Sequence, residues 1–256
     1  MARAPGKRIS ALVQAVEPCH RVVDVGSDHG LIARFLARRE DIDFVLATDI
    51  SEDSLAKLRD ILPTEPARIR QKIQIQVTDG LRELCWSSLD AIVIAGMGGE
   101  LMTRILAESI DFARRAGQWV LSPQKSPELL RRFLMDQDVL VRETMIKDGK
   151  HHYPILNVCT QKKMTSEYRK YAGRPYGLEY GPHLLEQRHP ELIRYLERER
   201  RDLLRLSANI PEQASSSALE KKESMLRKAR WISKYCAEEH DSDTEKREPI
   251  REDGRR

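Results

Sequence analysis

The sequence predicts an α/β fold in which a seven-stranded, mostly parallel sheet ends in an antiparallel hairpin and is followed by a pair of C-terminal helices. Up to about residue 165, short β-branched runs alternate with stretches whose apolar residues recur at helical spacing. Two further strand-like runs then follow one another with no helix between them. Beyond this point the sequence is rich in charges and has long helical periodicity, so we expect domains at residues 1–165 and 166–238.

Five short apolar runs predict the parallel strands, and the segments between them predict helices. The strands are expected at residues 22–25, 44–48, 73–77, 90–94 and 118–121, and the helices at residues 30–39, 51–62, 99–110 and 126–137. Ser51 and Ser126 are candidate N-caps, the second with Pro127 at the first helical position. Alternation of this kind indicates a parallel sheet that right-handed crossover helices cover on both faces.

The last two strand-like runs predict a hairpin. They cover residues 139–147 and 153–161 and flank Asp148-Gly149, which is a strong hairpin turn signal. Adjacent strands without an intervening helix form an antiparallel pair, which we place at the edge of the sheet. Five parallel strands that end in such a hairpin are typical of Rossmann-like methyltransferases, whereas a nucleotide dehydrogenase has no need of the hairpin. His151 and His152 follow the turn, and we expect them in a solvated loop.

The C-terminal part predicts two long amphipathic helices, residues 183–209 and 212–238, with a break at Ile210-Pro211. A narrow apolar stripe on each helix favours an antiparallel, coiled-coil-like hairpin. Residues 239–256 are polar, charged and without aromatic residues, so we expect this tail to be disordered. Basic residues near and on the first helix could contact RNA phosphates, although interleaved acidic residues are equally consistent with a solvated face. These basic residues are Arg169, Lys170, Arg174, Arg194, Arg198, Arg200 and Arg201.

Composition argues against several classes of protein. Hydrophobic residues make up 40% and charged residues 33% of the chain, which indicates a globular protein with a charged surface. No apolar run approaches the roughly 18 residues of a membrane span, and none follows the basic N-terminus, so we expect neither membrane insertion nor secretion. The four cysteines lie far apart without a CxxC pair, so we expect free thiols in the cytoplasm and no metal site. The net charge of +4 permits a nucleic-acid partner without requiring one.

The first predicted strand runs into a glycine corner, Asp24 to Gly30, that opens the following helix. Glycine lets the backbone approach a ligand closely, and at this corner a doubly wound sheet binds its ligand. A dinucleotide site would have a second glycine where this chain has Asp28, and a carboxylate there repels a pyrophosphate but attracts the sulfonium and ammonium groups of S-adenosylmethionine. We therefore expect this donor to be bound by Asp24, Gly26, Ser27, His29 and Gly30, although His29 is equally consistent with a polar residue at a helix start.

Two more acids follow the second and third strands. Asp49, with Ile50 behind it, lies about 20 residues beyond the glycine corner, where an acid can bond a ribose diol. Asp79-Gly80 ends the third strand, where a carboxylate can accept a hydrogen bond from the adenine amino group. Each acid alone is equally consistent with a helix cap, but three acids at three successive strand ends jointly indicate a nucleoside.

The fourth strand ends in Gly96-Met97-Gly98-Gly99, which we expect to shape the pocket where a substrate meets the methyl donor. The alternative is a tight strand-to-helix turn without ligand contact. Many enzymes that methylate amino groups have Asn-Pro-Pro-Tyr here, and its absence argues for a different nucleophile. We assign Asp28 and these four residues as the candidate catalytic group, with Asp28 stabilising positive charge that develops on the substrate.

The stretches DVGSDHG, TDIS, TDG and IAGMGG, with the later Tyr180-Gly181-Pro182 and the helical hairpin, resemble the TrmK family over residues 7–238. Members of this family are bacterial tRNA (adenine-22-N1) methyltransferases. The resemblance implies a class I methyltransferase fold, S-adenosylmethionine as donor, tRNA as substrate and a coiled-coil-like C-terminal domain. It also implies that the first motif is carried by Asp24, Gly26 and Asp28, that Asp49 binds the ribose and that Asp79 lies beside the adenine.

One departure from the family pattern follows the fifth strand. This chain has Leu121-Ser122-Pro123-Gln124 where Leu-Gln-Pro-Asn is expected, which leaves open whether Gln124 contacts the target base. For an adenine, N1 has a free lone pair at neutral pH, so no general base is needed. Binding energy then serves to flip the base out and to align N1 with the methyl group.

Other functions stay open beside this one: a nucleotide-dependent oxidoreductase, a non-catalytic RNA-binding protein on a methyltransferase scaffold, and a methyltransferase for another RNA base or a small molecule. The missing GxGxxG and the terminal hairpin argue against the first, the intact acids against the second, and the basic helical hairpin against a small molecule. As partners we expect tRNA but neither a membrane nor a metal, and as assembly state a monomer or weak homodimer.

Overall fold

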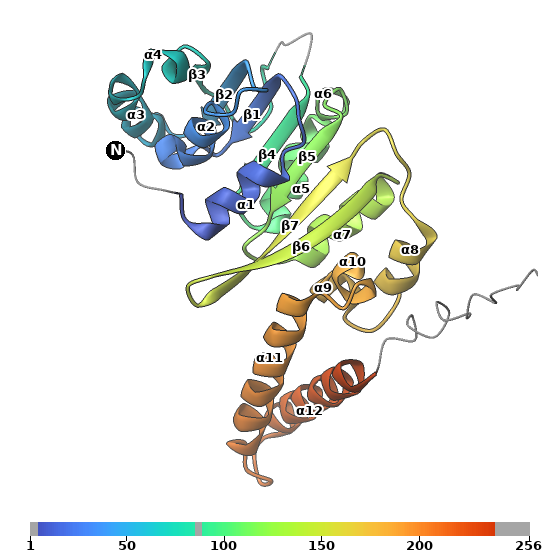
Figure 1. Cartoon of the computed structure of the whole chain (residues 1–256). Helices are drawn as coiled ribbons and strands as arrows, with labels where there is room; N and C mark the ends of the chain where they lie inside the picture. Colours follow the sequence, from blue (N-terminus) through green and yellow to red (C-terminus); the bar gives the residue numbers. More distant parts are fainter. Residues whose placement is uncertain (1–4, 85–88, 239–256) are drawn as a thin grey trace, which may run out of the picture. The chain divides into compact units, whose positions relative to one another are not determined.

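The computed structural model describes residues 5–84 and 89–238 of the chain. Two compact units divide the chain, Met1–Leu192 and Ile193–Arg256. The sheet belongs to the first unit, and most of the two long C-terminal helices belongs to the second (Figure 1). The helices that follow residue 165 up to residue 186 lie in the first unit. The domain boundary expected at residue 165 stays a prediction.

A seven-stranded sheet with the order β3-β2-β1-β4-β5-β7-β6 forms the centre of the first unit (Figure 1). Its strands are β1 (Arg21–Val25), β2 (Phe44–Asp49), β3 (Ile73–Val77), β4 (Ala91–Ala95), β5 (Gln118–Ser122), β6 (Leu140–Asp148) and β7 (His151–Cys159). Strands β1 to β5 are parallel, and β7 runs antiparallel to both β5 and β6. This confirms the predicted fold class. The strand order reverses between β1 and β4, and ligands bind at such a switch point, beyond the carboxyl ends of the strands.

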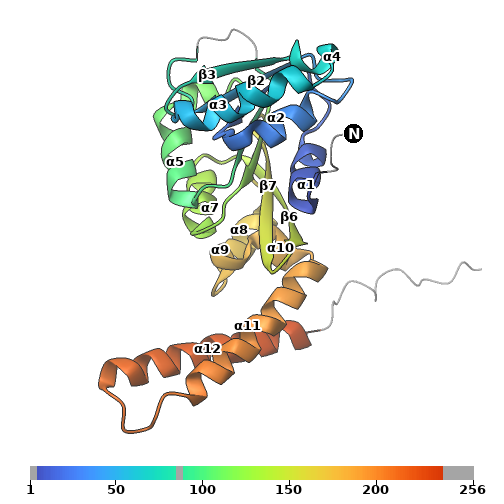
Figure 2. The ribbon, with the colours of Figure 1, turned by 90° about the vertical axis from the view of Figure 1, so that its left-hand side faces the viewer.

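Helices cover both faces of the sheet. Successive strand residues point to opposite sides, so each strand contributes to the core on both faces. In β1, Val23 and Val25 belong to one core cluster and Val22 belongs to the other. The first face is covered by α5 (Gly99–Glu108), α6 (Ile110–Ala113) and α7 (Pro127–Asp136), and the second by α1 (Lys7–Ala15), α2 (Leu31–Leu36), α3 (Glu52–Ile61) and α4 (Ala67–Arg70). Figure 2 shows α5 and α7 on one side of the sheet and α1 on the other. Two 3-10 turns, η1 (Asp28–Gly30) and η2 (Leu62–Thr64), complete these connections.

The two predicted N-caps have different outcomes. The Ser51 hydroxyl accepts a hydrogen bond from the Ser54 backbone N–H, so this cap is confirmed. Ser126 does precede α7, which begins at Pro127 as predicted, but its side chain makes no cap hydrogen bond. Its backbone is left-handed, with φ 48°. For Ser126, the prediction was therefore correct in its position at the start of α7 but wrong in its capping hydrogen bond.

The hairpin extends closer to its turn than the sequence indicated. Asp148 pairs with His151, so His151 and His152 are the first residues of β7. The expectation of a solvated loop at these histidines was wrong, because only Gly149 and Lys150 lie between the strands, with Gly149 at φ +60°. A two-residue turn lets strand pairing continue up to the turn itself.

Three short helices, α8 (Ser166–Ala172), α9 (Gly177–Tyr180) and α10 (Pro182–Glu186), close the first unit. They are held by a buried ion pair, in which the Arg131 guanidinium lies 2.7 Å from the Glu143 carboxylate, with side chains 1% and 0% exposed. Arg131 also donates to the carbonyls of Leu178 and Glu179. A Cβ at Gly181 would lie 2.5 Å from the Glu143 carboxylate, so only glycine fits beside the pair.

The expected helix of residues 183–209 is interrupted, and this prediction needs correction. It consists of α10 and a separate α11 (Pro190–Ala208). Pro190 lacks a backbone N–H and disfavours helical geometry in the residue before it, so a new helix begins there. Arg188 has a left-handed backbone, with φ 47°.

The second unit contains the rest of α11 and all of α12 (Ser216–Ala237). Lys228 of α12 lies 2.9 Å from Glu199 of α11, and the Ser215 hydroxyl caps α12. Two C-terminal helices are therefore confirmed. The predicted disordered tail and Cys85 lie outside the described residues. Within the described ranges, no helix is long and apolar enough to cross a membrane.

Candidate active site

A cavity of about 320 Å³ lies beyond the carboxyl ends of β1, β2, β4 and β5. Seven of the predicted site residues line it: Asp24, Gly26, Ser27, Asp28, Asp49, Gly96 and Met97. Six further residues complete its wall: Arg8, Ile9, Leu31, Ile32, Ala95 and Gln124. The fold thus brings together residues from the first, second and fourth predicted strand ends in a single cavity.

Asp24 is the buried acid of this cavity, with 1% of its surface exposed. Its carboxylate accepts hydrogen bonds from the Ser27 hydroxyl at 2.7 Å and from the Ala33 backbone N–H at 3.1 Å. Burial raises the pKa of Asp24 from 3.8 to about 6, although these two hydrogen bonds act in the opposite direction. The carboxylate is therefore mostly ionised at neutral pH at a cost in free energy, and a cationic ligand would relieve that cost.

Backbone hydrogen bonds fix the conformation of the glycine corner. The N–H groups of Gly26 and Ser27 both donate to the Thr48 carbonyl at 2.8 Å, and Gly26 has φ +77°. A Cβ at Gly26 would lie 2.0 Å from the Met97 methyl group, so Met97 lies directly over the corner. Glycine is needed here for both its conformation and its lack of a side chain.

Asp28 lies at the exposed rim of the cavity rather than in its interior. Its side chain is 57% exposed and lies 2.9 Å from His29 Nδ1 and 3.3 Å from Lys57 Nζ. Desolvation raises the pKa of Asp28, but the hydrogen bonds from Lys57 and His29 outweigh it, so the pKa lies below its usual value. His29 itself does not line the cavity, and neither does Gly30, where a Cβ would meet the Leu58 side chain at 2.3 Å.

The acids after β2 and β3 differ in position. Asp49 lines the cavity, and its carboxylate accepts a hydrogen bond from the Ser51 N–H at 2.9 Å. Ile50 beside it does not line the cavity but is 69% exposed, which is high for a large apolar side chain. Asp79 lies outside the lining and forms an ion pair with Arg82 at 3.3 Å. Gly80 packs on Ile105, to which its Cβ would approach within 2.9 Å.

The glycine-rich segment after β4 serves two purposes. Gly96, at φ +90°, and Met97 line the cavity, whereas Gly98 and Gly99 do not. Gly99 instead packs against the backbone before α7, since its N–H donates to the Lys125 carbonyl at 2.7 Å and a Cβ would lie 2.2 Å from the Ser126 oxygen. The first half of the segment thus faces the cavity and the second half fixes the start of α5.

Arg8 and Gln124 are cavity residues that sequence reasoning did not place there. Arg8 belongs to α1, a helix that was not predicted, and Gln124 had been singled out only as a departure from a family pattern. The atoms nearest to a Cβ at Gly96 would be Arg8 Nη2 at 3.8 Å and Gln124 Nε2 at 4.0 Å. Both side chains therefore approach the same glycine. The apolar periodicity of residues 9–16 was the signal that could have revealed α1.

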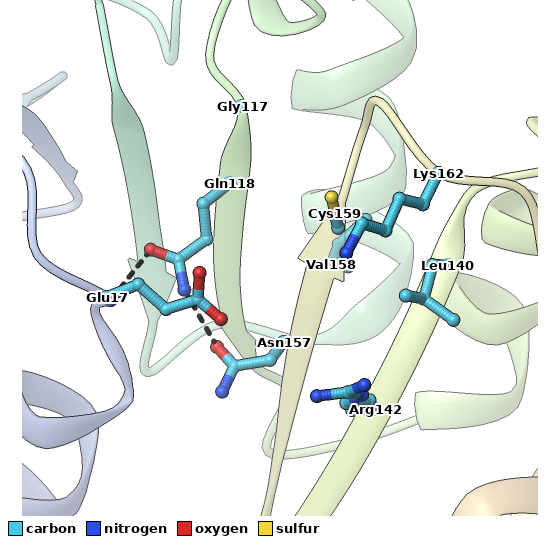
Figure 3. A pocket seen from close by; sticks show the side chains of 9 residues that line it. All are labelled: Glu17, Gly117, Gln118, Leu140, Arg142, Asn157, Val158, Cys159 and Lys162. Atoms are coloured by element: carbon cyan, nitrogen blue, oxygen red, sulfur yellow. Dashed lines mark hydrogen bonds between the residues drawn. The ribbon is translucent and has the colours of Figure 1, made fainter.

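A second cavity, of about 90 Å³, lies at the opposite edge of the sheet, where β5 begins (Figure 3). The Gln118 carboxamide there accepts from the Glu17 N–H at 3.0 Å and donates to the Ala15 carbonyl at 3.0 Å. It also lies 3.5 Å from the Asn157 oxygen. Its central polar side chain already has these partners. The cavity lies at the amino end of β5, away from the carboxyl ends of the parallel strands, so it is the weaker candidate.

The described residues do not form a metal site, and two polar ring residues near α9 and α10 lie away from the cavity. No group of three or more histidine, cysteine, aspartate or glutamate residues there could hold a metal ion. Tyr180 is 3% exposed, and His183 Nδ1 lies 3.0 Å from the Glu143 backbone nitrogen. His183 thus contacts the edge strand β6, and neither Tyr180 nor His183 lines the cavity.

Comparison with known proteins shows what this architecture is similar to. A methyltransferase domain family matches residues 6–156. The Mycoplasma genitalium protein MG248 is 30% identical over 163 residues, which are 61% of this chain and 71% of the relative. The tRNA (adenine(22)-N(1))-methyltransferase of Bacillus subtilis is 23% identical over 151 residues, 59% of this chain and 63% of that protein. The structure of M. capricolum TrmK with S-adenosylhomocysteine has a TM-score of 0.70 and 17% identity, covering 90% of this chain and 99% of that one.

Proposed function

The chain belongs to the methyltransferase domain family, and from this premise we propose that it methylates N1 of an adenine in tRNA, with S-adenosylmethionine as donor. The donor supplies an electrophilic methyl group when bound. The observation that carries the proposal is the cavity lined by Asp24, Asp28 and Asp49 around a glycine corner. Carboxylates attract a sulfonium and an ammonium but repel a pyrophosphate. The name of the Bacillus subtilis relative supports tRNA as the substrate and position 22 as the target.

The donor's two ends fit different parts of the cavity. Asp24 lies in the interior and would stabilise the charged amino-acid end, and Gly26 leaves room for it. Asp49, at the end of β2, would accept hydrogen bonds from the ribose hydroxyls. The exposed Ile50 beside it offers an apolar surface for the adenine ring. We retain Asp79 as a candidate for the adenine amino group, which would require its carboxylate to leave Arg82.

The target base would enter on the side of Gly96, Met97 and Gln124. The Gln124 side chain makes no hydrogen bond to any described residue, and a glutamine carboxamide can bond the N6 and N7 atoms of adenine. N1 attacks with its own lone pair, so the protein's task is to hold the base in line with the methyl group. The base becomes cationic in the reaction, and Asp28, ionised at the rim, would stabilise the developing charge.

The role of Asp28 can be tested by removing the charge of its side chain. Asp28→Asn should lower the single-turnover rate by about 10- to 100-fold, because a single electrostatic contact to the transition state is lost. The dissociation constant of the donor, measured by titration calorimetry, should change far less. Equal losses in rate and affinity would instead assign Asp28 to donor binding.

The reaction is tested by incubating the protein with methyl-labelled donor and unmodified bulk tRNA, followed by mass spectrometry of the nucleosides. We expect label in 1-methyladenosine. Asp49→Asn serves as a control that should weaken donor binding without changing which nucleoside is labelled. Label in another nucleoside would show that a base other than adenine is the substrate. Firm binding of a pyrophosphate dinucleotide without binding of the methyl donor would reject the proposed methyltransferase function.

Basic residues of the second unit are candidates for tRNA phosphates. Replacing Arg198, Arg200 and Arg201 together with glutamine should reduce the salt dependence of tRNA binding by up to about 2–3 in the slope of log K against log salt. An unchanged slope would exclude this helix face. A tRNA substrate also implies a cytoplasmic location. We keep a monomer or weak homodimer as the proposed assembly state, for which sedimentation equilibrium is the test.

A further inference from the structure

The two carboxylate oxygens of Asp28 have different surroundings. Oδ1 lies 2.9 Å from His29 Nδ1 and 3.3 Å from Lys57 Nζ. Oδ2 makes no hydrogen bond or ion pair with any described residue. Asp28 lines the cavity, so Oδ2 is the oxygen that stays available to a ligand there.

Helix α3 packs directly against the turn that carries Asp28. Leu58 of this helix is fully buried, and a Cβ at Gly30 would lie only 2.3 Å from it. The Asp28 N–H donates to the Gly26 carbonyl at 2.9 Å, so contacts hold the turn at its beginning and at its end. Lys57 precedes Leu58 on the same helix, and this packing brings its ammonium to the Asp28 carboxylate.

The Lys57 ammonium has Asp28 as its only hydrogen-bond or ion-pair partner among the described residues. The two side chains are 50% and 57% exposed, and an ion pair this exposed contributes little to the stability of a fold. Desolvation raises the pKa of Asp28, and the hydrogen bond from Lys57 is the largest of the effects that lower it below its usual value. Lys57 thus acts on the charge and the direction of Asp28 more than on the stability of the protein.

We propose that Lys57 is a positioning residue, which holds Oδ1 of Asp28 so that Oδ2 is directed at the target base. This inference rests on the proposed function, because Asp28 is the residue proposed to stabilise the cationic base. A carboxylate that rotates freely is in the productive direction for only part of the time, whereas a fixed one is always in place. The ammonium also repels a cationic base, but water screens this repulsion because Lys57 is half exposed.

The test compares Lys57→Gln with the wild type in the methylation of bulk tRNA. The variant should lower the single-turnover rate at saturating tRNA by about 3- to 10-fold, which is less than the loss in Asp28→Asn, because His29 still holds Oδ1. The KM for tRNA and the dissociation constant of the donor should stay nearly unchanged. Lys57→Arg keeps a cationic donor and should recover part of the rate. Arg59→Gln is the matched control, because Arg59 lies on the same helix but pairs with Glu52, and it should keep the full rate.

Two further measurements separate positioning from a general structural role. In an Asp28→Asn background, Lys57→Gln should have almost no further effect on the rate, since Lys57 acts through the Asp28 carboxylate. In an NMR titration of the free protein, Lys57→Gln should raise the pKa of the Asp28 carboxyl toward its usual value, because a hydrogen bond to the charged form is lost. Arg59→Gln should leave this pKa unchanged.

Equal rate losses with and without the Asp28 carboxylate would overturn the proposal. A raised KM for tRNA together with a lower salt dependence of tRNA binding would show that Lys57 binds an RNA phosphate instead. A faster Lys57→Gln variant would show that the lysine only masks the charge of Asp28. Each of these results would make the proposal wrong while leaving the proposed function intact, whereas a wild type that does not methylate tRNA would reject the proposed function and this inference with it. Thermal unfolding of each variant separates these outcomes from loss of the fold.

Discussion

Replacing Asp24 with asparagine should stabilise the protein at neutral pH and weaken donor binding there. Asp24 is 1% exposed, and its carboxylate accepts only two hydrogen bonds from described residues. Ionising it in the folded protein is therefore unfavourable compared with the unfolded chain. Asparagine has nearly the same shape and keeps an acceptor for Ser27 and Ala33, but carries no charge.

The magnitude follows from the pKa. A rise from 3.8 to about 6 corresponds to about 3 kcal/mol, because one pKa unit is about 1.4 kcal/mol. The folded protein binds the proton more tightly than the unfolded chain does, so this group's contribution is fully present below pH 3.8 and is lost as the pH rises to about 6. The asparagine variant has no such loss.

Urea unfolding of both proteins between pH 4 and pH 8 measures the effect. The free energy of unfolding of Asp24→Asn minus that of the wild type should rise by about 3 kcal/mol across this range, because the other titrating groups cancel in the difference. Ser27→Ala, which keeps the carboxylate, should retain the pH dependence of the wild type. A difference between Asp24→Asn and the wild type that does not vary with pH would refute the reasoning.

The charge of Asp24 should lower the stability of the protein but raise its affinity for the donor. A cationic donor favours the ionised carboxylate, so its affinity for the wild type should increase as the pH rises from 5 to 7. The donor affinity of Asp24→Asn should be lower at pH 7 and should lose this dependence. A stabilised variant that binds the donor as well as the wild type would remove Asp24 from the proposed site.

Two further predictions concern packing. Glu143→Ala should lower the free energy of unfolding by about 3–5 kcal/mol in urea titrations, because Arg131 would stay buried without its counter-charge. Arg169→Ala breaks an exposed ion pair and should cost less than about 1 kcal/mol, so equal losses would contradict the argument. Gly99→Ala should cost about 1–3 kcal/mol, since the new methyl group would meet a backbone oxygen at 2.2 Å. Gly98→Ala has room for its methyl group, so a similar loss there would show that packing is not the cause.

Much of the fold could be predicted because parallel strands are buried on both faces. Such strands are continuous apolar runs, as in Ala91–Ala95, where every residue is buried. The interruption between α10 and α11 was missed because the apolar stripe continues across it, and Pro190 alone marks the new start. Helix α1 was missed because it precedes the first strand and so lies outside the strand–helix alternation on which the prediction relied.

The candidate site was predictable where strand ends determine it. Asp24 and Asp49 lie in the last two residues of parallel strands, and the sheet brings them to one edge. Side-chain direction is not determined in this way, and Asp79 turns toward Arg82, three residues further on. Glycine is equally ambiguous, since Gly99 makes room for backbone rather than for a ligand. Arg8 could not be found because its place depends on contacts with residues far away in the sequence.

The hydrogen bond between Arg8 and Asp148 joins residues 140 positions apart. During synthesis, α1 leaves the ribosome before the hairpin and cannot pack against it until almost the whole first unit has been made. Closing so long a loop slows folding, because chain entropy is lost before the contact forms. The strand ends with their acids can therefore assemble early, while Arg8 takes its place beside the hairpin last.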